Sequence, residues 1–170
     1  MRLLAFVLIL TSTVGGADPA WVGRAEHNGR MAREAMDRSL RVTHAWLRLA
    51  DPVTGLLPRR DNNPNWVVRD SAADLYPFMI IASYFLEPQL YEGAMHDILR
   101  REMQLTMRVG RLSDDFLAGG SGFVRPKVEM DEIIFGSSEY MKDGLLPITE
   151  ILGETPWYHR MRGIATDMVK

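Results

Sequence analysis

The amino-acid sequence predicts an all-α protein built from antiparallel helical hairpins. Apolar residues recur at helical spacing over most of the chain, and Gly and Pro residues separate the periodic segments. No segment shows the apolar–polar alternation of a half-buried strand. We therefore expect one helical domain over residues 18–170, with about five helices that alternate between outer amphipathic and inner apolar ones.

Residues 1–17 are predicted to be a secretory signal peptide. Arg2 gives a positive start, Leu3 to Leu10 form an apolar run, and small residues precede Asp18. The run is too short to span a bilayer, so no stable membrane insertion is expected after cleavage. A buried N-terminal helix is the alternative, but the order of charge, apolar run and small residues favours export to the periplasm or the cell exterior.

Local signals give the expected helices their limits. The first must stop near Asp51 because Pro52 follows, Pro88 ends the second, Gly110 the third and Gly153 the fourth. The second helix has almost no polar face, so we expect it to be buried on all sides. The expected helices cover residues 21–50, a segment that ends near 86, residues 91–109, 131–152 and 157–170, with a loop or short hairpin at 112–127.

The segment from residue 65 to 86 holds the most informative local pattern. Asp70 and Asp74 lie where a polar loop turns into the second helix, and both are residue types that cap a helix N-terminus. A helix that starts at Ser71 would contain Pro77 and be kinked by it. A helix capped by Asp74 would instead place Pro77 in its first turn, where its missing N–H has no partner to lose.

A looser copy of this pattern follows at residues 137–153. Glu139 and Asp143 repeat the spacing of the two earlier acids, and Pro147 follows the second acid by four residues instead of three. Residues four apart share a helix face, so the two copies predict two related helix starts. Chance similarity is the alternative, since the copy is short.

Composition excludes several classes of protein and site. The net charge is −2 with 25% charged residues, which does not suggest a nucleic acid or an anionic membrane as a partner. The chain has no Cys, and its four His residues are dispersed, so we expect no metal site. Motifs for phosphate loops, dinucleotides and nucleophilic triads are absent, and no cofactor is expected.

Three runs resemble the bacterial six-hairpin glycosidase superfamily, the (α/α)6 toroids: TGLLPRR at 54–60, WVVRDSAADLYPFM at 66–79 and SSEYMKDGLLPITEILGETPWYHRM at 137–161. The resemblance implies a carbohydrate-active or carbohydrate-binding protein with its sugar cleft at one end of the inner helices. Such a toroid has twelve helices, so about five helices imply a partial toroid, the N-terminal part of a larger protein or a truncated reading frame.

Glycoside hydrolysis needs two carboxyl groups, one on each side of the scissile bond. The candidates are Asp70, Asp74, Glu139 and Asp143, because they lie at or near the starts of inner helices. Each also has a structural interpretation as a helix cap or a salt-bridge partner. For any single acid the structural interpretation is favoured. As a set at one cleft they are candidates for catalysis, with Asp70, Asp74 and Glu139 as the leading ones.

Two further residues are candidates for substrate binding. Trp66 offers an aromatic face for a sugar ring, or else anchors its loop against the helix ends. Arg69 offers a cation for a carboxylated sugar such as a uronic acid, or else pairs with Asp70 or Glu139. Asp114 and Asp115 are weaker catalytic candidates on a mobile loop.

The sequence thus predicts an exported carbohydrate-active or carbohydrate-binding protein, with glycoside hydrolase chemistry as the expected activity of a complete enzyme. This chain alone is expected to lack the complete catalytic pair. The alternatives are a helical-repeat scaffold that binds proteins without catalysis, or a truncated remnant. Carboxylates that converge at one end of the inner helices favour a sugar cleft, and carboxylates dispersed in salt bridges favour a scaffold.

Overall fold

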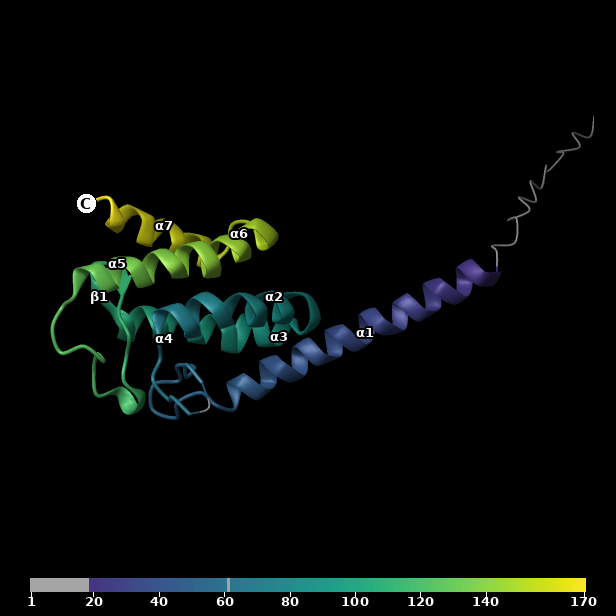
Figure 1. Ribbon diagram of the computed structural model, residues 1–170, viewed down its shortest axis with the longest axis horizontal. Helices are drawn as coiled ribbons and strands as arrows, with labels where there is room; N and C mark the ends of the chain where they lie inside the picture. The colour runs from purple at the N-terminus through teal and green to yellow at the C-terminus, as the bar shows by residue number, and fades with distance from the viewer. Residues whose placement is uncertain (1–18, 61) are drawn as a thin grey trace, which may run out of the picture. The chain divides into compact units, whose positions relative to one another are not determined.

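The computed structural model describes residues 19–60 and 62–170, so the predicted signal peptide lies outside the described residues. The chain divides into two units, residues 1–35 and 36–170. Helix α1 (Pro19–Leu47) contributes to both, and all other elements belong to the second unit (Figure 1).

The prediction of an all-α fold is confirmed. Only β1 (Met107–Val109) and β2 (Leu112–Ser113) form a sheet among the described residues, and this sheet is a single antiparallel hairpin. The helical segments of the second unit are η1 (Val68–Leu75), α2 (Tyr76–Leu86), α3 (Pro88–Leu90), η2 (Tyr91–Met95), α4 (His96–Thr106), η3 (Ala118–Gly120), α5 (Met130–Glu139), η4 (Tyr140–Leu145), α6 (Leu146–Leu152) and α7 (Pro156–Met168).

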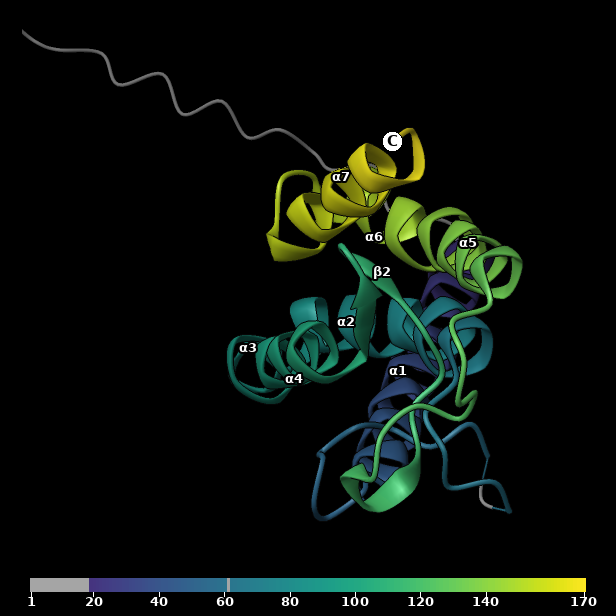
Figure 2. The same ribbon diagram turned by 90° about the vertical axis from the view of Figure 1, so that its left-hand side faces the viewer.

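These helical segments form two hairpins that pack on each other. The first hairpin joins η1 and α2 to η2 and α4, and the second joins α5, η4 and α6 to α7. Segments η1 and η4 make the closest association between the hairpins, and α2 lies beside α6, as the views in Figures 1 and 2 agree. The rings of Tyr76 and Tyr140 meet edge to face in this interior, 6.3 Å apart.

The second helix starts earlier than either predicted alternative. It begins with η1 at Val68, and neither Asp70 nor Asp74 caps it. Instead, Asp115 reaches in from a distant loop and accepts the Val68 N–H at 2.9 Å. The helix continues through Pro77 because η1 is π-helical, and a wider turn before a proline relieves the clash that a proline ring causes in a regular α-helix.

The expectation that the second helix is buried on all sides is wrong. Met79 and Ile80 are buried, but Phe78 is 75% exposed and Phe85 is 61% exposed. Residues 78 and 85 are seven apart, so they lie on one face of α2. The described helices of the second unit cover the other faces of α2 and leave this one open to solvent.

The third helix ends earlier than expected, and the fourth ends where it was expected to. The third helix ends at Thr106, not at Val109, because the chain turns into the β1–β2 hairpin. Gly110 makes that turn with a φ of +56°, a left-handed conformation that glycine adopts without strain. The segment expected as the fourth helix stays helical past Gly144, but it is π-helical over η4 around that residue, and it ends as expected at Gly153, whose φ is +73°.

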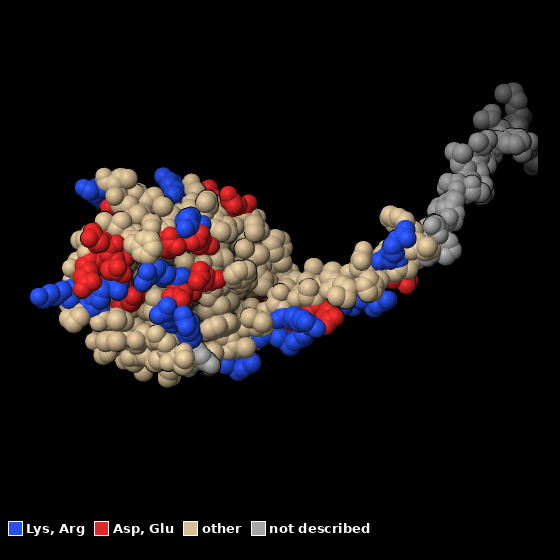
Figure 3. All heavy atoms as spheres, viewed as in Figure 1, with Lys and Arg blue, Asp and Glu red and all other residues tan. Residues whose placement is uncertain are grey.

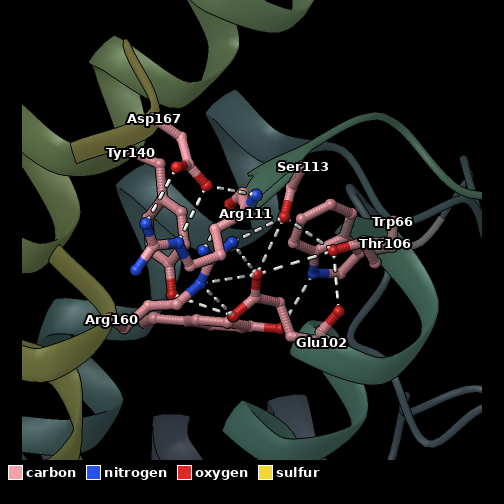
Figure 4. A network of polar contacts seen from close by, with 9 residues as sticks. Trp66, Glu102, Thr106, Arg111, Ser113, Tyr140, Arg160 and Asp167 are labelled. Carbon is pink, nitrogen blue, oxygen red and sulfur yellow. Dashed lines mark hydrogen bonds and ion pairs between the residues drawn. The ribbon is translucent and has the colours of Figure 1, made fainter. Parts of the chain in front are cut away.

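A buried polar network joins the hairpins (Figure 4). Glu102 is 0% exposed and pairs with Arg160 of α7, with Oε1 2.7 Å from Nη2. Its Oε1 also accepts a hydrogen bond from Ser113 Oγ at 3.0 Å, and Tyr140 Oη donates to Oε2 at 3.4 Å. This carboxylate therefore has the paired, hydrogen-bonded surroundings that a buried charge needs.

Candidate functional site

A pocket of about 470 Å³ opens between the two inner helices, α2 and α6. Its walls are mainly apolar, and two carboxylates border it, one from each hairpin. The ring of Phe78 gives the pocket an exposed aromatic wall. The lining residues are Ala73, Asp74, Pro77, Phe78, Ile81, Asp143, Pro147 and Ile151.

The two copies of the sequence pattern build opposite sides of this pocket. In each copy, a π-helical segment leads into an α-helix with proline in its first two positions. Each contributes one Asp, one Pro and one Ile to the lining, and the Ile follows the Pro by four residues in both. The copies can approach closely because Gly144 has no side chain, and a Cβ there would lie 3.0 Å from the Ala72 carbonyl oxygen.

The structure brings the four predicted carboxylates into one electrostatic neighbourhood. Lys142 lies 3.0 Å from Glu139 Oε1 and 3.2 Å from Asp143 Oδ2. Arg59 Nε lies 3.1 Å from Asp70 Oδ2. The side chain of Asp74 makes no hydrogen bond or ion pair within the described part of the chain.

The surroundings of Asp74 disfavour its negative charge. Loss of hydration raises the pKa of its carboxyl above the ordinary value, and the negative charges of Asp70, Asp143 and Glu139 raise that pKa further. A carboxyl with a raised pKa can hold a proton and donate it in a reaction, or, when ionised, can bind a cationic ligand. In both cases the raised pKa comes first from loss of hydration and then from the neighbouring negative charges.

This arrangement suits a ligand with both apolar and polar faces. A sugar ring has such faces, because its axial C–H groups can pack on an aromatic ring while its hydroxyl groups donate hydrogen bonds to carboxylates. The pocket volume lies within the range of typical small-molecule sites, roughly 300–1,000 Å³. The two carboxylates, one from each hairpin, offer acceptor oxygens to such a ring.

Trp66 does not line the pocket. It is 1% exposed, and its Nε1 donates a hydrogen bond to Tyr76 Oη at 2.8 Å. Its backbone forms a bridge with Phe116, with N···O distances of 3.0 and 2.9 Å. The buried ring has no free face for a sugar, so Trp66 anchors its loop, which is the structural alternative that its position predicted.

Arg69 has partners other than the predicted ones. Its Nη2 lies 3.8 Å from Glu132 Oε2, and its guanidinium lies 5.2 Å from the ring centre of Phe135. Neither Asp70 nor Glu139 pairs with it within the described residues. Arg69 remains partly exposed but does not line the pocket, and its predicted role toward a carboxylated sugar stays a prediction.

Asp114 and Asp115 are structural, because both are buried and paired. Asp114 forms ion pairs with Arg108, at 2.8 Å, and with Arg125, which also lies 3.1 Å from Asp115. The charges of these two acids raise the pKa of the Arg125 guanidinium against the opposing effect of burial. Placing these acids on a mobile loop as catalytic candidates was therefore wrong.

Sequence reasoning missed Phe78, the aromatic residue that does line the pocket. It was hidden inside an apolar run that predicted burial on all sides. The available signal was its spacing, since it follows Asp74 by four residues and therefore shares the helix face of that acid. Once Asp74 is placed on an open face, Phe78 must lie on it as well.

Metal sites, membrane-spanning helices and basic patches are the other features of the described residues that bear on function. No group of three potential metal ligands occurs within residues 19–60 and 62–170. No described helix combines the length and the apolar character that crossing a membrane requires. On the visible face of the second unit, acidic and basic side chains are interleaved and form no single basic patch (Figure 3).

Comparisons with known proteins assign no family to this chain. No protein-family model, no curated protein and no solved structure matches the sequence or the fold. The functional interpretation therefore depends on the pocket itself.

Proposed function

We propose that this chain is an exported carbohydrate-binding protein related to the (α/α)6 glycosidases, and that the pocket between α2 and α6 receives a sugar ring. One observation supports this proposal most strongly: Asp74, Asp143 and Phe78 line the same pocket. The aromatic wall would pack on the ring, and the carboxylates would accept hydrogen bonds from its hydroxyl groups. Asp70 and Glu139 act on the ligand through their charges.

Two variants of α2 test the proposal. Phe78→Ala removes the aromatic pocket wall, and we expect it to weaken oligosaccharide binding by roughly three- to tenfold, as the loss of an aromatic contact does. Phe85→Ala is the matched control, because Phe85 is an exposed phenylalanine of the same helix outside the pocket lining. Calorimetric titration with a panel of neutral and charged oligosaccharides gives both affinities. Equal losses in both variants, or no binding by the unmodified chain, would contradict the proposal.

The raised pKa of Asp74 favours a second candidate function, glycoside hydrolysis by a larger protein that contains this chain. Asp74 would be the proton donor, and Asp143 the carboxylate across the scissile bond. We expect no turnover by the present chain alone. In a longer protein, Asp74→Asn should abolish glycan turnover while binding persists, and full turnover in that variant would rule out this assignment.

The open face of α2 favours the other class of function, a scaffold that binds proteins. Exposed apolar side chains such as Phe85 and Ile151 support a protein-binding surface, because large apolar patches mark interaction surfaces. The variants above separate the two functions. A scaffold would lose its partner equally in Phe78→Ala and Phe85→Ala and would show no response to oligosaccharides.

A further inference from the structure

The pocket carries more negative charge than its surroundings neutralise. Lys142 pairs with two of the four carboxylates and Arg59 with a third. One lysine charge cannot balance both Glu139 and Asp143, and Asp74 has no cationic partner within the described residues. Two negative charges therefore remain uncompensated at the edge of the pocket.

The apolar walls strengthen the attraction between this excess negative charge and a cation in the pocket. Charges that border apolar surface interact through a lower effective dielectric than charges in open water, so a cation held in the pocket is attracted more strongly than one at a flat surface. Phe78 adds to this attraction, because the face of an aromatic ring favours a nearby cation. A neutral ring would gain from the walls and from hydrogen bonds to the carboxylates, whereas a cationic ring would also gain the attraction between opposite charges.

The placement of the charges fits a single cationic group on a ring-shaped ligand. Asp74 and Asp143 come from different hairpins, and apolar residues such as Ile81 and Ile151 lie with them in the lining. A ligand must therefore present apolar surface to most of the pocket and a cation to the carboxylates. An amino sugar meets this requirement, since its ring has apolar C–H faces and its amine is protonated.

We propose that the sugar preferred by this pocket carries a free, protonated amine, with Asp74 and Asp143 as the residues that select it. This inference rests on the proposed function and names its substrate class. It assigns Asp74 to ligand binding as an anion, so Asp74 contacts the ammonium group and does not serve as a proton donor toward this ligand. A bound ammonium group would also supply the counter-charge that the cluster lacks.

The test compares three oligosaccharides of equal length by calorimetry on the full chain: a glucosamine oligomer, its fully N-acetylated form and a glucose oligomer. We expect the glucosamine oligomer to bind about five- to tenfold more tightly than the other two at low salt, as one or two partly exposed ion pairs allow. The preference should shrink as salt is added, because salt screens the pairs.

Variants locate the preference in the pocket. Asp74→Asn and Asp143→Asn should each weaken binding of the glucosamine oligomer more than binding of the glucose oligomer, because only the amine loses an ion pair as well as a hydrogen bond. Asp97→Asn is the matched control, because Asp97 is an exposed aspartate of α4 that pairs with Arg100 outside the pocket. The ¹³C signal of the Asp74 carboxyl gives an independent readout, and its pKa should fall when the glucosamine oligomer is bound.

The outcomes separate this inference from the proposed function. Equal affinity for all three oligosaccharides would overturn the inference and leave the sugar pocket intact. Binding of none of them would overturn both. A lysine-rich peptide that binds as tightly as the glucosamine oligomer and shifts the same Asp74 signal would also overturn the inference, since the pocket would then select charge without a sugar.

Discussion

Replacing Arg160 by methionine leaves the carboxylate of Glu102 buried without its cation. Arg160 donates to Glu102 Oε1 from Nη2 at 2.7 Å and from Nε at 3.2 Å, and both side chains are almost fully inaccessible to solvent. Breaking such a pair costs about 3–5 kcal/mol, because the remaining charge keeps its desolvation penalty and loses its partner. A domain of this size has about 5–15 kcal/mol of stability in total. Arg160→Met should therefore remove a large part of the free energy of unfolding.

The assay is urea unfolding followed by tryptophan fluorescence, with the buried Trp66 and Trp157 as reporters. The double variant Glu102→Leu with Arg160→Met removes both charges, and we expect it to be at least about 2 kcal/mol more stable than the single variant. It will not recover fully, because Ser113 and Tyr140 also lose a partner. If Arg160→Met lowers the free energy of unfolding by less than about 1 kcal/mol, with an unchanged slope of that free energy against urea concentration, the ion pair is not a major source of stability and this prediction is refuted.

Three further predictions concern the pocket and the C-terminal helix. Gly144→Ala should destabilise the fold by about 1–3 kcal/mol through overpacking against the Ala72 carbonyl, whereas Gly93→Ala, with open space around it, should be neutral or stabilising in the same thermal unfolding measurement. The raised pKa of Asp74 means that its ionisation opposes folding, so stability falls as pH rises through the ordinary carboxyl range. Asp74→Asn should therefore raise the melting temperature at pH 7 and leave it unchanged near pH 2, and the reverse pattern would contradict the raised pKa. Hydrogen bonds from Arg111 and Lys170 lower the pKa of Asp167, so its contribution to stability is complete at neutral pH and shrinks steadily as pH falls below the ordinary carboxyl range. Asp167→Asn should therefore lower the melting temperature more at pH 7 than near pH 2.

Helix existence could be predicted from the sequence because it depends on local spacing. The segments that became α1, α2, α4, α5 with α6, and α7 were all indicated by apolar periodicity and by Gly and Pro signals. Gly153 ended its helix as expected, since a left-handed residue is a local requirement. The two related helix starts were also visible, because each copy carries its acid and its proline at similar spacing.

Features that depend on distant residues could not be predicted. The cap of η1 comes from Asp115, nearly fifty residues away, and no local rule connects it with Val68. Glu102 directly follows two arginines, a pattern typical of an exposed helix face, yet it is buried and paired with Arg160 from the last helix. Trp66 was ambiguous for the same reason, because only the position of Tyr76 in three dimensions decides that its ring is enclosed.

The carboxylates show how far a candidate site can be predicted. Their grouping followed from equal positions in two repeated helix starts, and the structure places Asp74 and Asp143 at one pocket. Which of them would be unpaired did not follow from the repeat. That difference depends on Arg59 and Lys142, whose partners are set by the packing of loop and helix.

The most direct test of the sugar pocket is an NMR titration of the full chain with oligosaccharides, with the methyl groups of isoleucine as probes. The proposed function predicts that the signals of Ile81 and Ile151 shift together and saturate, because both line the pocket. The signal of Ile98, a buried residue of α4 outside the lining, should stay in place. Shifts at Ile98 without shifts at the pocket, or no shifts for any oligosaccharide, would contradict the account.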